Sequence, residues 1–146
     1  MGDRCFIEIT MRREDLSRFG AHVHAEPGAE WWDRIVDDNP DTATVSVLEA
    51  NYGWYDERVE AASAGIPFYG THSEGGEYGP YAFASWKGIH REAPLDCDGD
   101  MVVPVGEDLK PLYGLSRIRK YLAVLRKVRA ELARPLAKRP PLRVAA

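Results

Sequence analysis

The stretch Gly65–His90, GIPFYGTHSEGGEYGPYAFASWKGIH, is the part of the chain around which a fold can be built. Two short aromatic runs, Ile66–Tyr69 and Tyr81–Trp86, flank a tip with four glycines. Runs of Phe, Tyr, Trp and Ile bounded by Gly and Pro are typical of strands, so the stretch predicts a β-hairpin with a long loop. Glycines supply the turns of such a loop, and we expect an exposed, mobile tip between buried strands.

The residues before this hairpin predict two strands and three short helices. Alternating side chains indicate the first strand, and β-branched residues indicate the second. The expected strands are Arg4–Met11 and Thr42–Ala50, and the expected helices are Arg13–Phe19, which Gly20 ends, Glu30–Asp38, and Asp56–Ala64 with Gly65 at its C′ position. The connection from the second strand to Ile66 is long enough for a crossover to a parallel strand.

After the hairpin, an Asp-Gly pair at 98–99 separates two runs that carry apolar residues. This pattern predicts a second hairpin, formed by Ile89–Cys97 and Asp100–Val105. Pro94 and Pro104 place that pair at the edge of a sheet, because proline cannot donate to a ladder.

The segment Leu115–Ala133 predicts one long amphipathic helix, with Ser116 as its N-cap and Pro135 just after its end. Its expected apolar stripe is formed by Leu115, Ile118, Leu122, Leu125, Val128 and Leu132.

Together these elements predict an α+β fold: a mixed or antiparallel sheet of about five or six strands, helices on one face, and a basic C-terminal helix. We expect a single domain over residues 1–134. Residues 135–146, with three prolines and several basic residues, predict a disordered tail.

Composition is that of an ordinary globular protein, with 45% hydrophobic residues over 146 positions. No run approaches the 18 apolar residues of a membrane span, and the N-terminus lacks the apolar region of a secretory signal. Cys5 and Cys97 are far apart in sequence, which suits reduced thiols. We therefore expect a cytoplasmic protein that needs no cofactor.

The net charge of −4 is unevenly divided. Residues 1–109 carry 22 acidic and 8 basic side chains, whereas residues 110–146 carry 11 basic side chains and a single acid, Glu131. Such a division indicates either charged partners or two parts of the chain that neutralise each other.

Two clusters have the residue types of metal ligands. His22, His24 and Glu26 alternate as ligands on a strand do, and resemble the HxH pair of cupins and amidohydrolases. In cupins the ligand glutamate lies further along the chain than Glu26 does here. This chain is too short for an amidohydrolase barrel. Aspartates at 96, 98 and 100 follow the spacing of an EF-hand loop, but Met101 stands where that loop needs glycine. We expect no metal, with His22 and His24 as weak candidates.

The central hairpin also resembles ADP-ribosyltransferases of the PARP-like class. The segments Phe68–Thr71 and Gly79–Ala84 are similar to that family's HGT strand and GxYFA segment. Tyr69 stands at the position of the NAD-binding histidine, and the two segments are closer in sequence than in the family. If the chain is an enzyme, we expect a hydrolase or transferase with its active site at the 70–79 loop. Its catalytic residues would then be His72, Glu74 and Glu77.

The sequence favours a small acidic protein that binds another protein and has no enzymatic activity. Its acidic body suits a basic protein partner, as in the anti-restriction and anti-CRISPR inhibitors of phages and plasmids, which compete with nucleic acid. A nucleic-acid accessory protein that uses the basic helix is a further alternative. The sequence leaves the oligomeric state open. The candidate binding residues are Tyr78, Tyr81, Trp86, Arg117, Lys120, Arg126 and Lys127.

Overall fold

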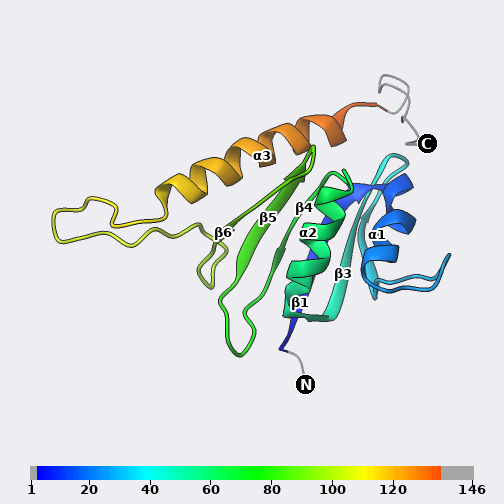
Figure 1. The fold of residues 1–146 in the computed structure, drawn as a ribbon, viewed down its shortest axis with the longest axis horizontal. Coiled ribbons are helices and arrows are strands. Elements are labelled where there is room, and N and C mark those ends of the chain that lie inside the picture. Colours follow the sequence, from blue (N-terminus) through cyan, green and yellow to red (C-terminus); the bar gives the residue numbers. More distant parts are fainter. Residues whose placement is uncertain (1–2, 136–146) are drawn as a thin grey trace.

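A six-stranded antiparallel sheet forms the centre of the computed structural model, which describes residues 3–135 (Figure 1). The predicted α+β class is therefore confirmed. The strands lie in the order β2-β3-β1-β4-β5-β6. Their bounds are β1 Arg4–Arg12, β2 Arg34–Asp38, β3 Thr42–Asn51, β4 Phe68–His72, β5 Tyr81–Trp86 and β6 Ile89–Pro94. The helices are α1 Leu16–His22, α2 Tyr55–Ser63 and α3 Leu115–Ala133, and short 3-10 turns cover Arg13–Asp15 and Tyr52–Trp54.

The predicted central hairpin is present as β4 and β5, which pair antiparallel from Phe68 opposite Ser85 to His72 opposite Tyr81. β4 extends to His72 because β1 pairs along its other side. The sequence pattern placed Gly70 and His72 in the tip, and the structure corrects this, because both residues belong to β4. Since β3 and β4 both run antiparallel to β1, they are parallel to each other. The segment with α2 is the crossover between them, as its length predicted.

α1 and α2 cover one face of the sheet, and the C-terminal helix α3 covers the other. The first core cluster joins α1 and α2 to β1, β3 and β4, and includes Phe83 of β5. The second joins α3 to Ala82, Ala84 and Ala93. Neighbouring residues of a strand point to opposite faces, so Phe83 faces α2 while Ala82 and Ala84 face α3. β5 is apolar on both sides, and its alanines give α3 room to pack closely.

The predicted helix Glu30–Asp38 is wrong. Residues 34–38 form β2, which pairs with β3. Trp31 lies before the strand, against the rings of Phe19 and Trp54, and its Nε1 donates to the carbonyl of Leu16 at 2.7 Å. Packing of the tryptophan in the first core determines this segment, although the sequence spacing of its apolar residues is helical.

Two helix ends also differ from the prediction. Gly20 does not end the first helix, since α1 continues to His22. A Cβ at Gly20 would lie 2.8 Å from the Trp31 ring, so this glycine allows a close approach instead. α3 spans Leu115–Ala133 as predicted, but Gly114 and not Ser116 is its N-cap residue. Gly114 has a φ of 90°, a conformation that favours glycine.

The buried stripe of α3 also differs in part from the prediction. Ile118 and Leu122 are only partly buried, and Leu115, the first residue of α3, is exposed. The buried side chains of the helix are Tyr121, Val124, Leu125, Val128 and Leu132.

Candidate functional site

Arg58 is the largest fully buried side chain of the described protein. It lies on the inner face of α2 beside Ala61 and Ala62, and its solvent exposure is 0%. The guanidinium carbon lies 4.1 Å above the centre of the Phe83 ring, and Nε donates to the carbonyl of Gly53 at 2.8 Å. Burial lowers the pKa of Arg58 to about 10, so the group stays charged at neutral pH.

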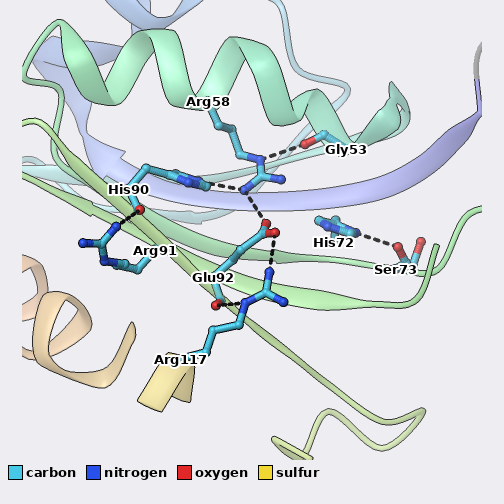
Figure 2. A network of polar contacts seen from close by, with 8 residues as sticks. All are labelled: Gly53, Arg58, His72, Ser73, His90, Arg91, Glu92 and Arg117. Carbon is cyan, nitrogen blue, oxygen red and sulfur yellow. Dashed lines mark hydrogen bonds and ion pairs between the residues drawn. The ribbon is translucent and has the colours of Figure 1, made fainter. Parts of the chain in front are cut away.

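Two residues of the edge strand β6 contact this guanidinium (Figure 2). Nη1 of Arg58 lies 2.9 Å from Nε2 of His90 and 3.6 Å from Oε2 of Glu92. Because an arginine only donates, Nε2 of His90 accepts, and this imidazole is neutral. Burial, with the charges of Arg58 and Arg91 added, lowers the pKa of His90 to about 3.

Glu92 is shared between two arginines. Its Oε1 accepts from Arg117 of α3 at 2.9 Å, and its backbone carbonyl accepts from Nε of Arg117 at 3.1 Å. The guanidinium of Arg117 also lies 5.1 Å from the centre of the Tyr81 ring. We call Arg58, Glu92 and Arg117 the arginine–glutamate cluster. It holds two positive charges and one negative charge.

A cavity of about 440 Å³ opens beside the arginine–glutamate cluster, between α2, the turn before it and the β4–β5 hairpin. Its volume lies within the usual range for small-molecule sites. Four tyrosines supply much of its wall. The lining residues are Asn51, Tyr52, Tyr55, Asp56, Glu57, Arg58, His72, Tyr78, Tyr81 and Glu92.

His72 is a buried wall of this cavity. Its Nδ1 lies 2.8 Å from the carbonyl of Ser73, which accepts, so Nδ1 carries the proton and Nε2 is a free acceptor. Burial lowers the pKa of His72, and the bond to Ser73 opposes that shift. Gly53 lies directly against the ring, since a Cβ there would meet His72 Cδ2 at 3.0 Å.

The structure separates the predicted enzyme residues. His72 lines the cavity from a strand, whereas Glu74 and Glu77 are exposed in the loop and do not line it. Among the predicted aromatic binding residues, Tyr78 and Tyr81 line the cavity. Trp86 lies on the opposite face of the sheet, where it packs in the core under α3.

Sequence reasoning missed Arg58, His90 and Glu92. One observation was available in the sequence: Arg58 precedes Ala61 and Ala62 by three and four positions, which places a charge on the face of α2 that carries its small apolar residues. His90 and Glu92 gave no comparable indication, because only the pairing of β6 with β5 brings them to the α2 face.

A second candidate surface is the projecting arm, which we define as residues 95–114. Figure 1 shows it extending away from the sheet between β6 and α3. It contains an isolated bridge from Leu95 to Met101 and another from Val105 to Pro111. The predicted strand Asp100–Val105 does not form, since only Met101 and Val105 take part in bridges, and the chain turns again at Gly106–Leu109.

The projecting arm exposes large apolar side chains. Leu109, at the tip of the second turn, is 81% exposed and has a φ of 63°, which a leucine rarely adopts. The arm also carries five acidic side chains against Lys110 alone. Its other exposed apolar residues are Met101, Val102, Val105, Leu112 and Tyr113.

On α3, the four predicted basic binding residues, Arg117, Lys120, Arg126 and Lys127, are all exposed. Within residues 3–135, Lys120, Arg126 and Lys127 have no recorded hydrogen bond or ion pair. Arg117 differs from them, because Glu92 already holds it.

His22 and His24 do not alternate on a strand. His22 is the last residue of α1 and lies 3.7 Å from Glu60, while His24 follows in a turn with a φ of 60°. Over the described part of the chain, no group of three or more His, Cys, Asp or Glu side chains is arranged to hold a metal ion.

Comparison with known proteins found no matching family model, no significantly similar curated protein and no significantly similar solved structure. The resemblance of the hairpin to ADP-ribosyltransferases therefore stays a prediction. Tyr69, at the histidine position of that motif, is partly buried in the core under α3, with the guanidinium of Arg129 5.3 Å from its ring centre. Among residues 3–135, no helix has the length and apolar character required to cross a membrane.

Proposed function

We propose that the protein acts by binding another protein through the projecting arm. The observation that carries this proposal is the run of large apolar side chains that the arm exposes. Large apolar side chains that are exposed close together in a chain support an interaction site, because extended apolar surface is uncommon on monomeric proteins. The left-handed conformation of Leu109 adds support, since unfavourable backbone conformations concentrate at functional positions.

The charge of the arm indicates the chemistry of its partner. Five acidic side chains accompany the apolar ones, so the complementary surface is an apolar hollow surrounded by Lys and Arg. Asp96 has a structural task, because its Oδ1 accepts from the backbone nitrogens of Asp98 and Asp100. Asp98 and Glu107 are exposed and available for a partner.

The narrower function we propose is inhibition of a nucleic-acid-binding protein. A basic surface that binds phosphates is also one that would accept the acidic arm, and the two ligands would then exclude each other. This form of the proposal rests on the charge of the arm and of the acidic body.

The arm carries a natural labelling position for the test, since Cys97 is exposed and the other cysteine, Cys5, is buried. A photoactivatable crosslinker on Cys97 should capture a partner from cells that contain this protein. The variant Leu109→Asn keeps a residue that tolerates the left-handed backbone but removes the apolar tip, and capture should fall strongly. The matched control is Leu48→Asn, because Leu48 is 64% exposed on β3 and lies outside the arm.

Each outcome is decisive. If Leu109→Asn abolished capture and added nucleic acid prevented it, both partner binding and the proposed inhibition would be supported. If added nucleic acid did not affect capture, partner binding would still be supported, but the proposed inhibition of a nucleic-acid-binding protein would be refuted. If the only captured species were a second copy of this chain, or if Leu48→Asn had the same effect as Leu109→Asn, the proposed partner binding would be refuted.

A further inference from the structure

One nitrogen of Arg58 is buried without a hydrogen-bond partner. Nε and Nη1 contact Gly53, His90 and Glu92, whereas Nη2 has no acceptor among the described residues. Figure 2 shows this nitrogen pointing to the side on which His72 lies, and both residues line the 440 Å³ cavity. A buried donor without an acceptor is costly, and a ligand that brings an acceptor into the cavity would satisfy it.

The charge around this nitrogen favours an anionic acceptor. Arg58 and Arg117 share Glu92, which leaves one positive charge in excess in the arginine–glutamate cluster. Asp56 and Glu57 also line the cavity and oppose an anion. They lie on the first turn of α2, Asp56 exposed and Glu57 partly exposed, and solvent screens such charges more than it screens a buried guanidinium.

A neighbouring hollow extends the positive surroundings. It has a volume of about 610 Å³, and it shares Tyr55 and Glu92 with the Arg58 cavity. Arg91, Lys120 and Arg117 line it. An anion that reaches the mouth of the first cavity therefore meets basic side chains on the β6 side.

The walls of the cavity indicate the rest of the ligand. Tyr52, Tyr55, Tyr78 and Tyr81 line the space beside Arg58. Such rings bind flat apolar groups by stacking and edge contacts. They also suit cations, but the buried charge of Arg58 opposes a cation at this place.

We propose that the Arg58 cavity binds a small molecule in which a flat apolar body carries an oxyanion, either a carboxylate or a phosphate. The oxyanion accepts from Nη2 of Arg58, and the flat body lies among the tyrosines. This site is independent of the projecting arm, so either proposal can fail without the other.

The test follows the Arg58 Nε–H signal of the wild-type protein by NMR, with benzoate and phenyl phosphate as probes. Benzamide and benzylammonium are the neutral and cationic controls of similar shape. We expect a saturable shift of the Arg58 signal with one or both anions and none with the controls. The stronger of the two anions identifies the carboxylate or the phosphate as the preferred group.

Variants locate the binding at the cavity. Arg58→Gln should abolish anion binding, but this variant removes a buried side chain and its folding must be checked. Tyr55→Ala changes an exposed ring at the mouth and should weaken the affinity at least about tenfold. Leu48→Ala, on exposed β3 and outside both hollows, should leave affinity unchanged.

The proposal is overturned if neither anion shifts the Arg58 signal at millimolar concentration. It is overturned equally if benzamide binds as well as benzoate, since charge would then not matter, or if benzylammonium binds best. If Leu48→Ala weakened anion binding and Tyr55→Ala did not, the site would lie elsewhere, and the proposal would also be refuted.

Discussion

Nη1 of Arg58 lies 2.9 Å from Nε2 of His90, and this contact joins α2 to the edge strand of the sheet. The arrangement requires a neutral imidazole, because the only available lone pair points at a positive charge. The rings of Phe68 and Phe83 lie beside His90, with centroids 6.2 and 6.4 Å away. The imidazole is thus held in its neutral form. Protonation in acid would break its contact with Arg58 at the wall of the cavity.

We predict that His90 makes the protein less stable in acid. Its pKa in the folded protein is about 3, against 6.5 as the ordinary value, so the unfolded chain binds a proton more readily. The free energy of unfolding should therefore fall as pH decreases from 6.5 towards 3, by at most about 1.4 kcal/mol per pH unit for this residue. Denaturant unfolding at a series of pH values measures the slope. His72, whose pKa is also lowered, contributes in the same direction.

The matched variant for this prediction is His90→Gln. A glutamine oxygen can accept from Arg58 but does not titrate, so the slope between pH 6.5 and 4.5 should decrease. An unchanged slope would show that His90 does not titrate differently in the folded and unfolded states.

We predict that the volume and the charge of Arg58 have separable effects on stability. Arg58→Ala leaves a hole above Phe83 and should lower the free energy of unfolding by about 2–5 kcal/mol. Arg58→Met fills most of the space, and Glu92 keeps Arg117 as its partner, so its cost should be smaller by at least about 1 kcal/mol. Equal losses in urea unfolding would mean that the charge, and not the packing, makes the contribution.

Gly70 should tolerate no side chain. A Cβ there would collide with the backbone carbonyl of Glu8 on the paired strand and would lie 2.9 Å from Cζ of Phe83. Gly70→Ala should therefore force β1 and β4 apart and lower the melting temperature strongly. Gly79→Ala is the control, because no atom lies within 4 Å of its added Cβ, and it should change stability by no more than about 0.5 kcal/mol. Similar effects of the two substitutions would contradict the close pairing of β1 with β4.

The sequence predicts elements whose pattern is local and fails where tertiary contacts decide. The aromatic runs of β4 and β5 and the length of α3 follow from periodicity and from Gly and Pro. The spacing of Trp31 and Ile35 is equally regular, but burial of Trp31 against Phe19 makes the segment extended. The same holds for the site, since His90 and Glu92 reach Arg58 only through the pairing of β5 with β6.

The two faces of α3 should respond differently to substitution. Leu125 is buried in the second core, so Leu125→Ala should cost about 2–5 kcal/mol. The helical pattern alone predicts the same loss of stability for Leu122→Ala. Leu122 is only partly buried, however, so we expect a smaller loss. Reversal of exposed Arg126 and Lys127 to Glu should change stability by about 1 kcal/mol or less. Thermal unfolding of these variants tests the order, and a larger loss from the reversals than from Leu125→Ala would show that the faces are assigned wrongly.

The tip between β4 and β5 should depend on Asp3 for its order. The glycines predict a mobile tip, yet the Asp3 carboxylate accepts from the backbone nitrogens of Gly76 at 2.7 Å and Glu77 at 2.8 Å. Bonds to a charged acceptor are stronger than neutral ones, so Asp3→Ala should speed hydrogen exchange of these two amides by about 10-fold or more. Glu77→Ala removes only an exposed side chain and should leave both amides as slow as in the wild type. Exchange at Gly76 and Glu77 that is already as fast as in an unfolded chain before substitution would show that Asp3 does not hold the tip. The loop would then not position Tyr78, whose hydroxyl lies 3.4 Å from the Asp3 carbonyl, in the wall of the Arg58 cavity.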